Sequence, residues 1–269
     1  MGYLLKLEWL KFRRNTVFLL MSSLYLFLLP ALFLLSRSIF STAPGMSSEA
    51  MMSFPAVWSV VGYIGNWLAF FFLGFFAIYM FTSEFTNRTY RQNVINGISR
   101  RQLYFAKVLF LIVIAILAAV FYACVCLLIG LAATKNISML IVFERASLIP
   151  RYFIMCLGYM SLGLLFSILI RRTAVTVFLY FVYILFFEVI VRWSFHRKIA
   201  DNITMNLYPA NAFEDLVPMP LADWALTQQF VSDNQGISFL SPAQAVLTSL
   251  VYLVIILGWG YFNMSRRDL

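Results

Sequence analysis

The chain has 269 residues, of which 62% are hydrophobic, 18% aromatic and only 12% charged. A soluble domain is closer to half apolar and a quarter charged. The composition therefore excludes an ordinary soluble enzyme and, despite a net charge of +9, a soluble nucleic-acid-binding domain. It predicts a membrane protein that crosses the bilayer several times. The three cysteines lie in apolar runs and there is one histidine, so we expect neither a disulfide framework nor a metal site.

The N-terminal segment Gly2–Arg14 mixes apolar residues with four basic ones and is predicted to be an interfacial helix. The alternative is a simple basic anchor that flanks the first membrane span. The apolar run that follows, residues 16–36, is too long for the core of a signal peptide. We therefore expect an uncleaved transmembrane helix.

Five further runs reach the roughly 20 apolar residues that a spanning helix needs. They cover residues 55–82, 103–133, 149–170, 173–193 and 243–264. The predicted fold class is all-α, with one transmembrane domain over residues 1–269 and six spans. The polar stretch 194–242 contains four prolines, so we expect short interfacial or re-entrant helices before the last span. The sequence does not give the role of this segment.

The distribution of charge gives an orientation. With the N-terminus in the cytoplasm, thirteen of the 20 Lys and Arg residues lie on the cytoplasmic side, where the net charge is +10, against −1 outside. Positive residues are retained in the cytoplasm, so both termini and the segment 83–107 are expected there. Compact loops and the absence of eukaryotic targeting signals favour a bacterial inner membrane.

The segment 83–107 reads SEFTNRTYRQNVINGISRRQLYFAK and joins the second and third spans. Neither Gly nor Pro interrupts it before Val94, so the second span is expected to continue as a polar helical extension. Asn96 and Gly97 are a stop signal, and Ser99 with Gln102 has the form of a capping box. The segment is therefore predicted to form a helix, a tight turn and a second helix.

The chemistry of this extension suits a partner protein. Glu84, Arg88 and Arg91 are spaced to share one helical face, and Phe85 and Tyr90 are candidate aromatic anchors. Aromatic residues and Arg dominate the energetics of protein interfaces. The alternative is a polar loop whose basic residues bind anionic lipid and fix the topology.

The segment resembles the coupling region of bacterial ABC exporter permeases of the six-helix type V class, the class-two exporter permease family. Residues that match in order are Glu84, the run 87–93, Gly97, Ser99, Arg100 and Lys107. The resemblance implies that a separate ATP-binding-cassette ATPase subunit docks here. The implied contact residues are Glu84, Phe85, Asn87, Arg88, Thr89, Tyr90, Arg91, Gly97 and Arg100.

The resemblance also implies an assembly of two ATPase subunits with two permease chains, as a homodimer or a heterodimer. The chain contains no GxxxxGK[ST] phosphate-binding loop. We therefore expect no cofactor in this chain, with ATP and Mg held by the partner ATPase, and membrane lipid around the spans. Nucleic acid is not an expected partner.

In that family the second and fifth spans line the translocation path. The candidate path residues here are Asn66, Phe70, Gly74, Tyr180, Tyr183, Phe187 and Glu188. Asn66 is a lone amide that either lines the path or forms an interhelical hydrogen bond. Helical spacing places three aromatic residues on one face of the fifth span: Tyr180, Tyr183 and Phe187. They form either an aromatic wall of the path or ordinary packing between helices. Such a wall would suit an amphipathic, lipid-like or peptide substrate.

Glu188 and Arg192 are four residues apart near the outer end of the fifth span, with the acid first. This is the favourable order for a pair on a helix. A charge inside a bilayer is expected to be paired. The interpretation is a structural ion pair, and the alternative is a gate or a substrate contact.

Taken together, the residues and the resemblance predict the permease subunit of an ATP-driven exporter. An ATP-independent membrane scaffold or sensor is the alternative. An integral membrane enzyme is less favoured because acids and histidine are too few to form a catalytic cluster at membrane depth. The sequence does not predict the substrate or any accessory subunit.

Overall fold

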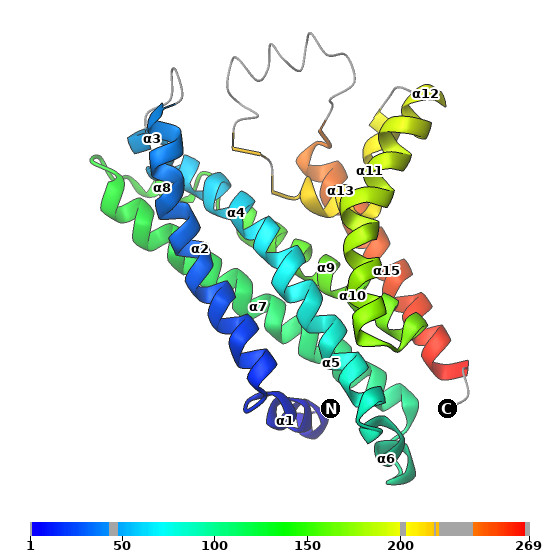
Figure 1. The fold of residues 1–269 in the computed structure, drawn as a ribbon. Coiled ribbons are helices and arrows are strands. Elements are labelled where there is room, and N and C mark those ends of the chain that lie inside the picture. The colour runs from blue at the N-terminus through cyan, green and yellow to red at the C-terminus, as the bar shows by residue number, and fades with distance from the viewer. Residues whose placement is uncertain (1, 43–47, 200–202, 218, 221–238, 267–269) are drawn as a thin grey trace.

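The computed structural model describes residues 2–42, 48–199, 203–217, 219–220 and 239–266. This part of the chain is helical and contains no strand (Figure 1). The helices are α1 (Gly2–Phe12), α2 (Thr16–Thr42), α3 (Ser48–Met52), α4 (Ala56–Leu68), α5 (Gly74–Thr86), α6 (Thr89–Ile95), α7 (Arg100–Ala133), α8 (Met139–Phe143), α9 (Leu148–Ile170), α10 (Thr173–Val182), α11 (Glu188–Ile190), α12 (Arg197–Ile199), α13 (Pro209–Glu214) and α15 (Pro242–Arg266). Three π-helical segments, η1 (Ala69–Leu73), η2 (Tyr183–Phe187) and η3 (Val191–His196), and the 3-10 turn η4 (Ile203–Asn206) complete the set.

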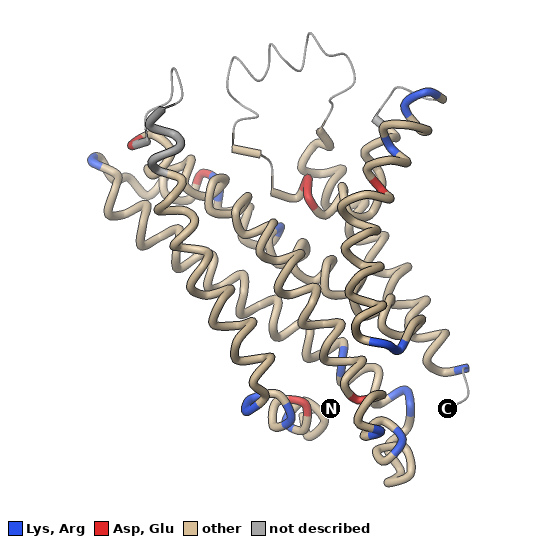
Figure 2. Tube along the Cα trace, in the orientation of Figure 1, with Lys and Arg blue, Asp and Glu red and all other residues tan. Residues whose placement is uncertain are grey.

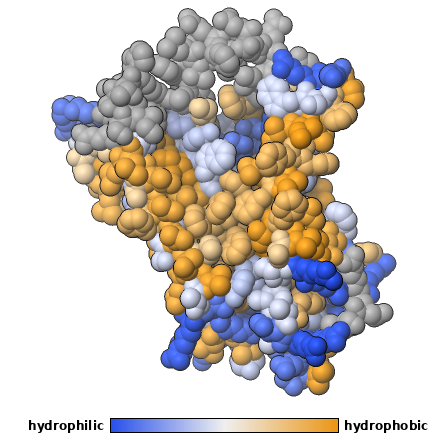
Figure 3. Space-filling view, viewed as in Figure 1, coloured by the Kyte–Doolittle hydropathy of each residue, from blue (hydrophilic) through white to orange (hydrophobic). Residues whose placement is uncertain are grey.

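Six of these helical stretches are long and apolar enough to cross a membrane, which confirms the predicted number of spans. They cover Thr16–Ser36, Ala56–Thr86, Arg100–Ala133, Met139–Ile170, Thr173–Ile199 and Pro242–Arg266. The fifth runs beyond the predicted end at Trp193, because η3 and α12 continue the helix to Ile199. Hydrophobic side chains dominate the middle of the surface, and hydrophilic ones gather at the end that carries α1 and α6 (Figure 3).

The second and fourth spans form the centre of the bundle. In each, 72% of the most apolar window is buried inside the chain, against 22% for the first span and 17% for the fifth. Small residues bring α5 and α9 together: a Cβ placed on Gly163 would lie 2.8 Å from the carbonyl oxygen of Gly74. Close backbone contact at small residues is typical of helix packing in membranes.

π-Helical turns interrupt both the second and the fifth span, which are the two spans expected to line a path. Such turns change the hydrogen-bond ladder and are frequent at functional sites. The Tyr180 hydroxyl in the fifth span donates to the backbone oxygen of Phe70 in η1, at 3.0 Å. The altered turn of one span is thus tied to the other.

The N-terminal segment is a helix packed on the bundle, rather than only a basic anchor. Phe12 of α1 is buried and stacks on Phe110 of α7, with ring centroids 5.8 Å apart. Asn15 then caps α2, since its side-chain oxygen accepts from the amides of Val17 and Phe18 at 3.0 and 3.2 Å. Lys and Arg residues are dense around α1, α6 and the start of α7 (Figure 2).

The connection between the second and third spans differs from the prediction of one continuous helix to Val94. The helix ends at Thr86, because Arg88 adopts a left-handed backbone with φ 58° and turns the chain before α6 begins. The predicted stop at Gly97 is confirmed by its φ of 89°. The capping box is also confirmed: the Gln102 amide donates to Ser99, and the Gln102 side chain accepts from the Ser99 amide.

Between the fifth and sixth spans the structure contains η4 and α13. Phe213 of α13 packs against the space left by Gly158 of α9, and Ser249 of α15 donates to the backbone oxygen of Ala212 at 3.1 Å. The expected short helices therefore exist over residues 203–214. The rest of that prediction, over residues 200–202, 218 and 221–238, lies outside the described residues.

Candidate functional site

Four charged side chains meet where α1, α5 and α7 converge. Lys107 of α7 contacts Glu8 at 2.5 Å and Glu84 at 2.6 Å, and Lys11 of α1 contacts each of the same two carboxylates at 2.8 Å. We call Glu8, Lys11, Glu84 and Lys107 the charge cluster. Two positive and two negative charges make it neutral, so each buried ion has opposite charges beside it.

The charge cluster is internal. The side chains of Lys107, Glu8 and Glu84 are 1%, 2% and 5% exposed, and Lys11 is 32% exposed. Burial lowers the pKa of Lys11, but the two carboxylates outweigh burial, so its pKa is raised. The carboxylate of Glu84 therefore binds α1 and α7 of its own chain. The side chain also lines two hollows at this end of the bundle, and its second oxygen accepts no hydrogen bond within the described part of the chain. Its contact with a partner protein stays a prediction.

The two aromatic residues predicted as anchors also point inward. Tyr90 is 3% exposed and stacks on Phe85, with ring centroids 4.8 Å apart. The Arg171 guanidinium lies over the other aromatic ring of this pair, Phe85, at 5.1 Å. Thr89 donates its hydroxyl to the backbone oxygen of Glu84 at 3.3 Å. These contacts hold α6 against the bundle rather than against a partner.

The outer face of α6 is the surface that this packing leaves free. Asn87, Arg88 and Arg91 are exposed there, and Ile95 at the end of the helix is 83% exposed. Glu84 lies on α5, before the turn at Arg88, but it lines a hollow of about 240 Å³ together with Arg88 and Arg91. We call Asn87, Arg88, Arg91, Gln92 and Ile95 the α6 face. Gly97 lies in the exposed turn that follows, and Arg100 is half-buried at the start of α7.

Ile95 was missed in the sequence-based prediction. Its signal is an isoleucine in a polar helix, directly before the Asn96–Gly97 stop. An apolar side chain among Arg and amide groups, exposed at the tip of a short helix, matches the apolar centre and polar rim of protein interfaces.

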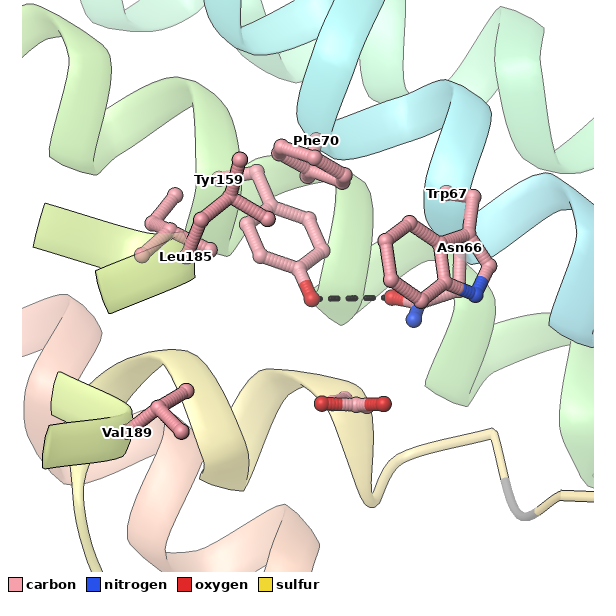
Figure 4. A pocket seen from close by; sticks show the side chains of 8 residues that line it. Asn66, Trp67, Phe70, Tyr159, Leu185 and Val189 are labelled. Carbon is pink, nitrogen blue, oxygen red and sulfur yellow. Dashed lines mark hydrogen bonds between the residues drawn. The ribbon is translucent and has the colours of Figure 1, made fainter. Parts of the chain in front are cut away.

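A cavity of about 160 Å³ lies beside the middle of the second span, close to α13 (Figure 4). Its lining comes from the second, fourth and fifth spans and from α13: Asn66, Trp67, Phe70, Tyr159, Ile184, Leu185, Val189 and Glu214. We call it the α13 pocket. Asn66 is 3% exposed, and its side-chain oxygen accepts from the Tyr159 hydroxyl at 2.9 Å. The amide thus forms the interhelical hydrogen bond and also lines a cavity.

The other predicted path residues occupy different places. Phe70 lines the α13 pocket, but Gly74 packs under Tyr180, whose hydroxyl would lie 2.1 Å from a Cβ at Gly74. Tyr180 is fully buried, whereas Tyr183 stacks on Phe187 and Phe187 is 58% exposed. Tyr180 turns into the bundle, where its hydroxyl donates to the backbone oxygen of Phe70, and Phe166 packs against both Tyr180 and Tyr183. The role of this aromatic group in a path stays a prediction.

The predicted ion pair between Glu188 and Arg192 is not formed in the described structure. The Glu188 carboxylate accepts from the backbone amides of Ala210 and Asn211 at 3.0 and 2.8 Å, and so holds the start of α13. Arg192 donates to the side chain of Asn206 at 2.7 Å. Arg192 lies in π-helical η3, where the wider turn no longer places residues four apart over one another.

Two acids at the end of α13 were not singled out from the sequence. Burial raises the pKa of Asp215 to about 6, while its carboxylate accepts from the amide of Leu240 at 3.1 Å. Burial also raises the pKa of Glu214. Their signal in the sequence is an adjacent acidic pair directly after an apolar helical turn.

The comparisons with known proteins give one family. Residues 4–188, more than half of the chain, match the model of the family described as ABC-2 family transporter protein. The match spans α1, the first four membrane spans and the fifth as far as Glu188, and so includes the α6 face and the charge cluster. No curated protein matches the chain.

Proposed function

The chain belongs to the ABC-2 transporter family, and from that premise we propose that it is the permease subunit of an ATP-driven exporter. As a member of that family it is a transmembrane component of a transporter. We further propose the energy source and the direction of transport. A separate ATP-binding-cassette subunit docks on the α6 face, and substrate moves out of the cell. The membrane is then a bacterial inner membrane, with α1 and α6 on the cytoplasmic side.

The exposed tip of α6 carries this proposal. Arg91 and Ile95 project from a short helix that is fixed at its base by the Phe85–Tyr90 stack. A basic and apolar protrusion on a rigid base suits insertion into a groove of another protein. ATP and Mg would be held by that partner, and the motion of the partner would be received by α6.

The charge cluster gives such a motion a path into the bundle. Glu84 lies at the end of the second span and is tied to α1 through Lys11 and to α7 through Lys107. Separating these charges in a buried place costs several kcal/mol, so α1, α5 and α7 are expected to move as one body. A displacement of α6 would therefore reach the second span directly.

Two such chains are proposed to pair around the path, with two ATPase subunits below. The fifth span supports this, because its large apolar side chains are exposed: Phe178 is 65% exposed, Phe186 59% and Phe187 58%. Trp67 and Phe71 of the second span are each about half exposed, at 48% and 49%. These surfaces would face the second permease chain and the membrane lipid.

The test is co-purification from native membranes in mild detergent, with mass spectrometry of the bound proteins. We expect an ATP-binding-cassette subunit with the natural chain, and its loss with Arg91→Glu or Ile95→Asp. The control is Lys135→Glu, which reverses an exposed charge on the loop after the third span, where Lys135 lies 3.6 Å from the carboxylate of Glu49. Recovery of the natural chain without any ATPase would contradict the proposal.

A further inference from the structure

Glu214 is an unpaired carboxylate in the wall of the α13 pocket. It is partly buried, and no hydrogen bond or ion pair is present at its side chain within the described part of the chain. Arg192 acts on Glu214 electrostatically but forms no ion pair with it within the described residues, because its guanidinium donates to Asn206 and to the backbone oxygen of Met205, at 2.7 and 3.0 Å. A carboxylate in such surroundings is stabilised by an external cation.

The rest of the pocket is aromatic and apolar. The rings of Trp67, Phe70 and Tyr159 and the side chains of Leu185 and Val189 line it. Aromatic faces attract organic cations, and they do so most strongly where water is excluded. An inorganic cation would instead require several oxygen ligands, which these side chains do not supply.

One polar group in the wall can recognise a second feature of a ligand. The Tyr159 hydroxyl donates to the side-chain oxygen of Asn66. The side-chain nitrogen of Asn66 has no hydrogen bond in the described structure. This nitrogen is available to donate to a carbonyl or hydroxyl oxygen beside the cationic group.

The segment that connects the fifth and sixth spans supplies acids but no base. Between Lys198 and Arg266 there is no Lys or Arg, whereas five acids occur: Asp201, Glu214, Asp215, Asp223 and Asp233. No basic side chain of this connecting segment can therefore neutralise Glu214.

From these observations we infer that the α13 pocket binds an organic ammonium group attached to an apolar body, with Glu214 as its counter-ion and the Trp67, Phe70 and Tyr159 rings around it. The volume of about 160 Å³ is comparable to that of an apolar cavity of roughly 150 Å³ that takes up benzene. The inference rests on the proposed function only in naming this ligand as the transported substrate. Amine-bearing lipids and water-soluble amphiphilic amines share this chemistry.

The experiment measures binding to the purified chain in an uncharged detergent, by saturation-transfer NMR. Benzyltrimethylammonium is the cationic probe, benzyl alcohol the neutral one and benzoate the anionic one. We expect the cation to bind most tightly and benzoate most weakly. Glu214→Gln should weaken binding of the cation about tenfold, which corresponds to about 1.4 kcal/mol. Glu214→Lys should reverse the order of cation and anion.

The control is Glu144→Gln, which removes an exposed acid at α8, away from the pocket, and should leave all three affinities unchanged. Thermal unfolding verifies that Glu214→Gln is folded. We expect an unfolding temperature close to that of the natural chain, because the Glu214 side chain forms no hydrogen bond or ion pair in the described structure that the substitution would remove. Equal binding of cation and benzoate, or natural affinity in Glu214→Gln, would overturn the inference.

A competition step separates the two sources of the ligand. Displacement of the probe by phosphatidylethanolamine but not by phosphatidylglycerol assigns the site to a membrane lipid, and displacement by neither assigns it to a ligand from water. The binding assay needs no ATPase. A chain that binds the cation through Glu214 but recruits no ATPase would refute the proposed function and leave the site standing.

Discussion

Lys107 is the residue on which the charge cluster depends most, because it is almost fully buried and contacts both carboxylates. Lys107→Met would leave two acids with one lysine. Removing one partner of a buried pair costs roughly 3–5 kcal/mol, so we expect a loss of that size in thermal unfolding of the purified chain. The double variant Lys107→Met with Glu8→Gln restores neutrality and should be more stable than Lys107→Met alone. Equal stability of the two variants would show that the charges do not interact.

Gly74 tests the tie between the second and fifth spans. Gly74→Ala would place a methyl group against the Tyr180 ring and hydroxyl, where less than 3 Å is free. Overpacking of this kind destabilises a core by roughly 1–3 kcal/mol, measurable as a lower unfolding temperature. The matched control is Gly258→Ala, since a Cβ at Gly258 meets nothing within 4 Å. A similar response of both variants would contradict the packing described.

Asp215 gives the chain a pH dependence with a defined sign. Its pKa is raised from 3.8 to about 6 by burial, so the native chain binds a proton more tightly than the unfolded chain. The contribution is fully present below pH 4 and is lost as the pH rises through 6. Relative to Asp215→Asn, the natural chain should lose up to about 3 kcal/mol over this interval. A constant difference between pH 4 and 7 would contradict the assignment.

At the scale of elements, the orientation of α6 depends on the left-handed backbone at Arg88. That conformation costs roughly 1–2 kcal/mol for a residue with a Cβ and nothing for glycine. Arg88→Gly should therefore be at least as stable as the natural chain, and Arg88→Val less stable by about 1 kcal/mol or more. If valine is tolerated as well as glycine, α5 and α6 do not need this turn.

The same turn shows where sequence reasoning succeeds and where it stops. Runs of apolar residues predicted the six spans, and the Gly97 stop and the Ser99 capping box were also predicted, because local chemistry decides them. The break at Arg88 carries no Gly or Pro; tertiary packing of Tyr90 on Phe85 imposes it. The sequence identified Lys107 as a residue that matches the coupling region of the family. It did not identify Lys107 as the partner of Glu8, because the two residues are 99 positions apart.

The fifth span was the least predictable element. The spacing of Glu188 and Arg192 presumes a regular α-helix, whereas η2 and η3 replace two of its turns. The amides of α13 then take the carboxylate of Glu188. Residue spacing reveals neither the π-helical turns nor the contact between Glu188 and the start of α13. Of the residues that line the α13 pocket, the sequence therefore indicated only Asn66 and Phe70.

At the scale of the whole molecule, one helical span connects the two candidate sites. Asn66 and Phe70 line the α13 pocket, and Glu84 of the same span, Ala56–Thr86, belongs to the charge cluster. The π-helical segment η1 lies between Asn66 and Glu84. A push on α6 would therefore pass along a buried helix to the pocket, and η1 is the place in that helix where the hydrogen-bond ladder changes register.

The most direct test of this account is photo-crosslinking in native membranes, with a benzophenone amino acid placed at position 95 in the α6 face. We predict a crosslink to an ATP-binding-cassette ATPase, and none from the same group at Leu140, which is as exposed but lies at the opposite end of the bundle. A crosslink from position 95 to lipid alone, or an ATPase crosslink from position 140, would contradict the docking of an ATPase on α6.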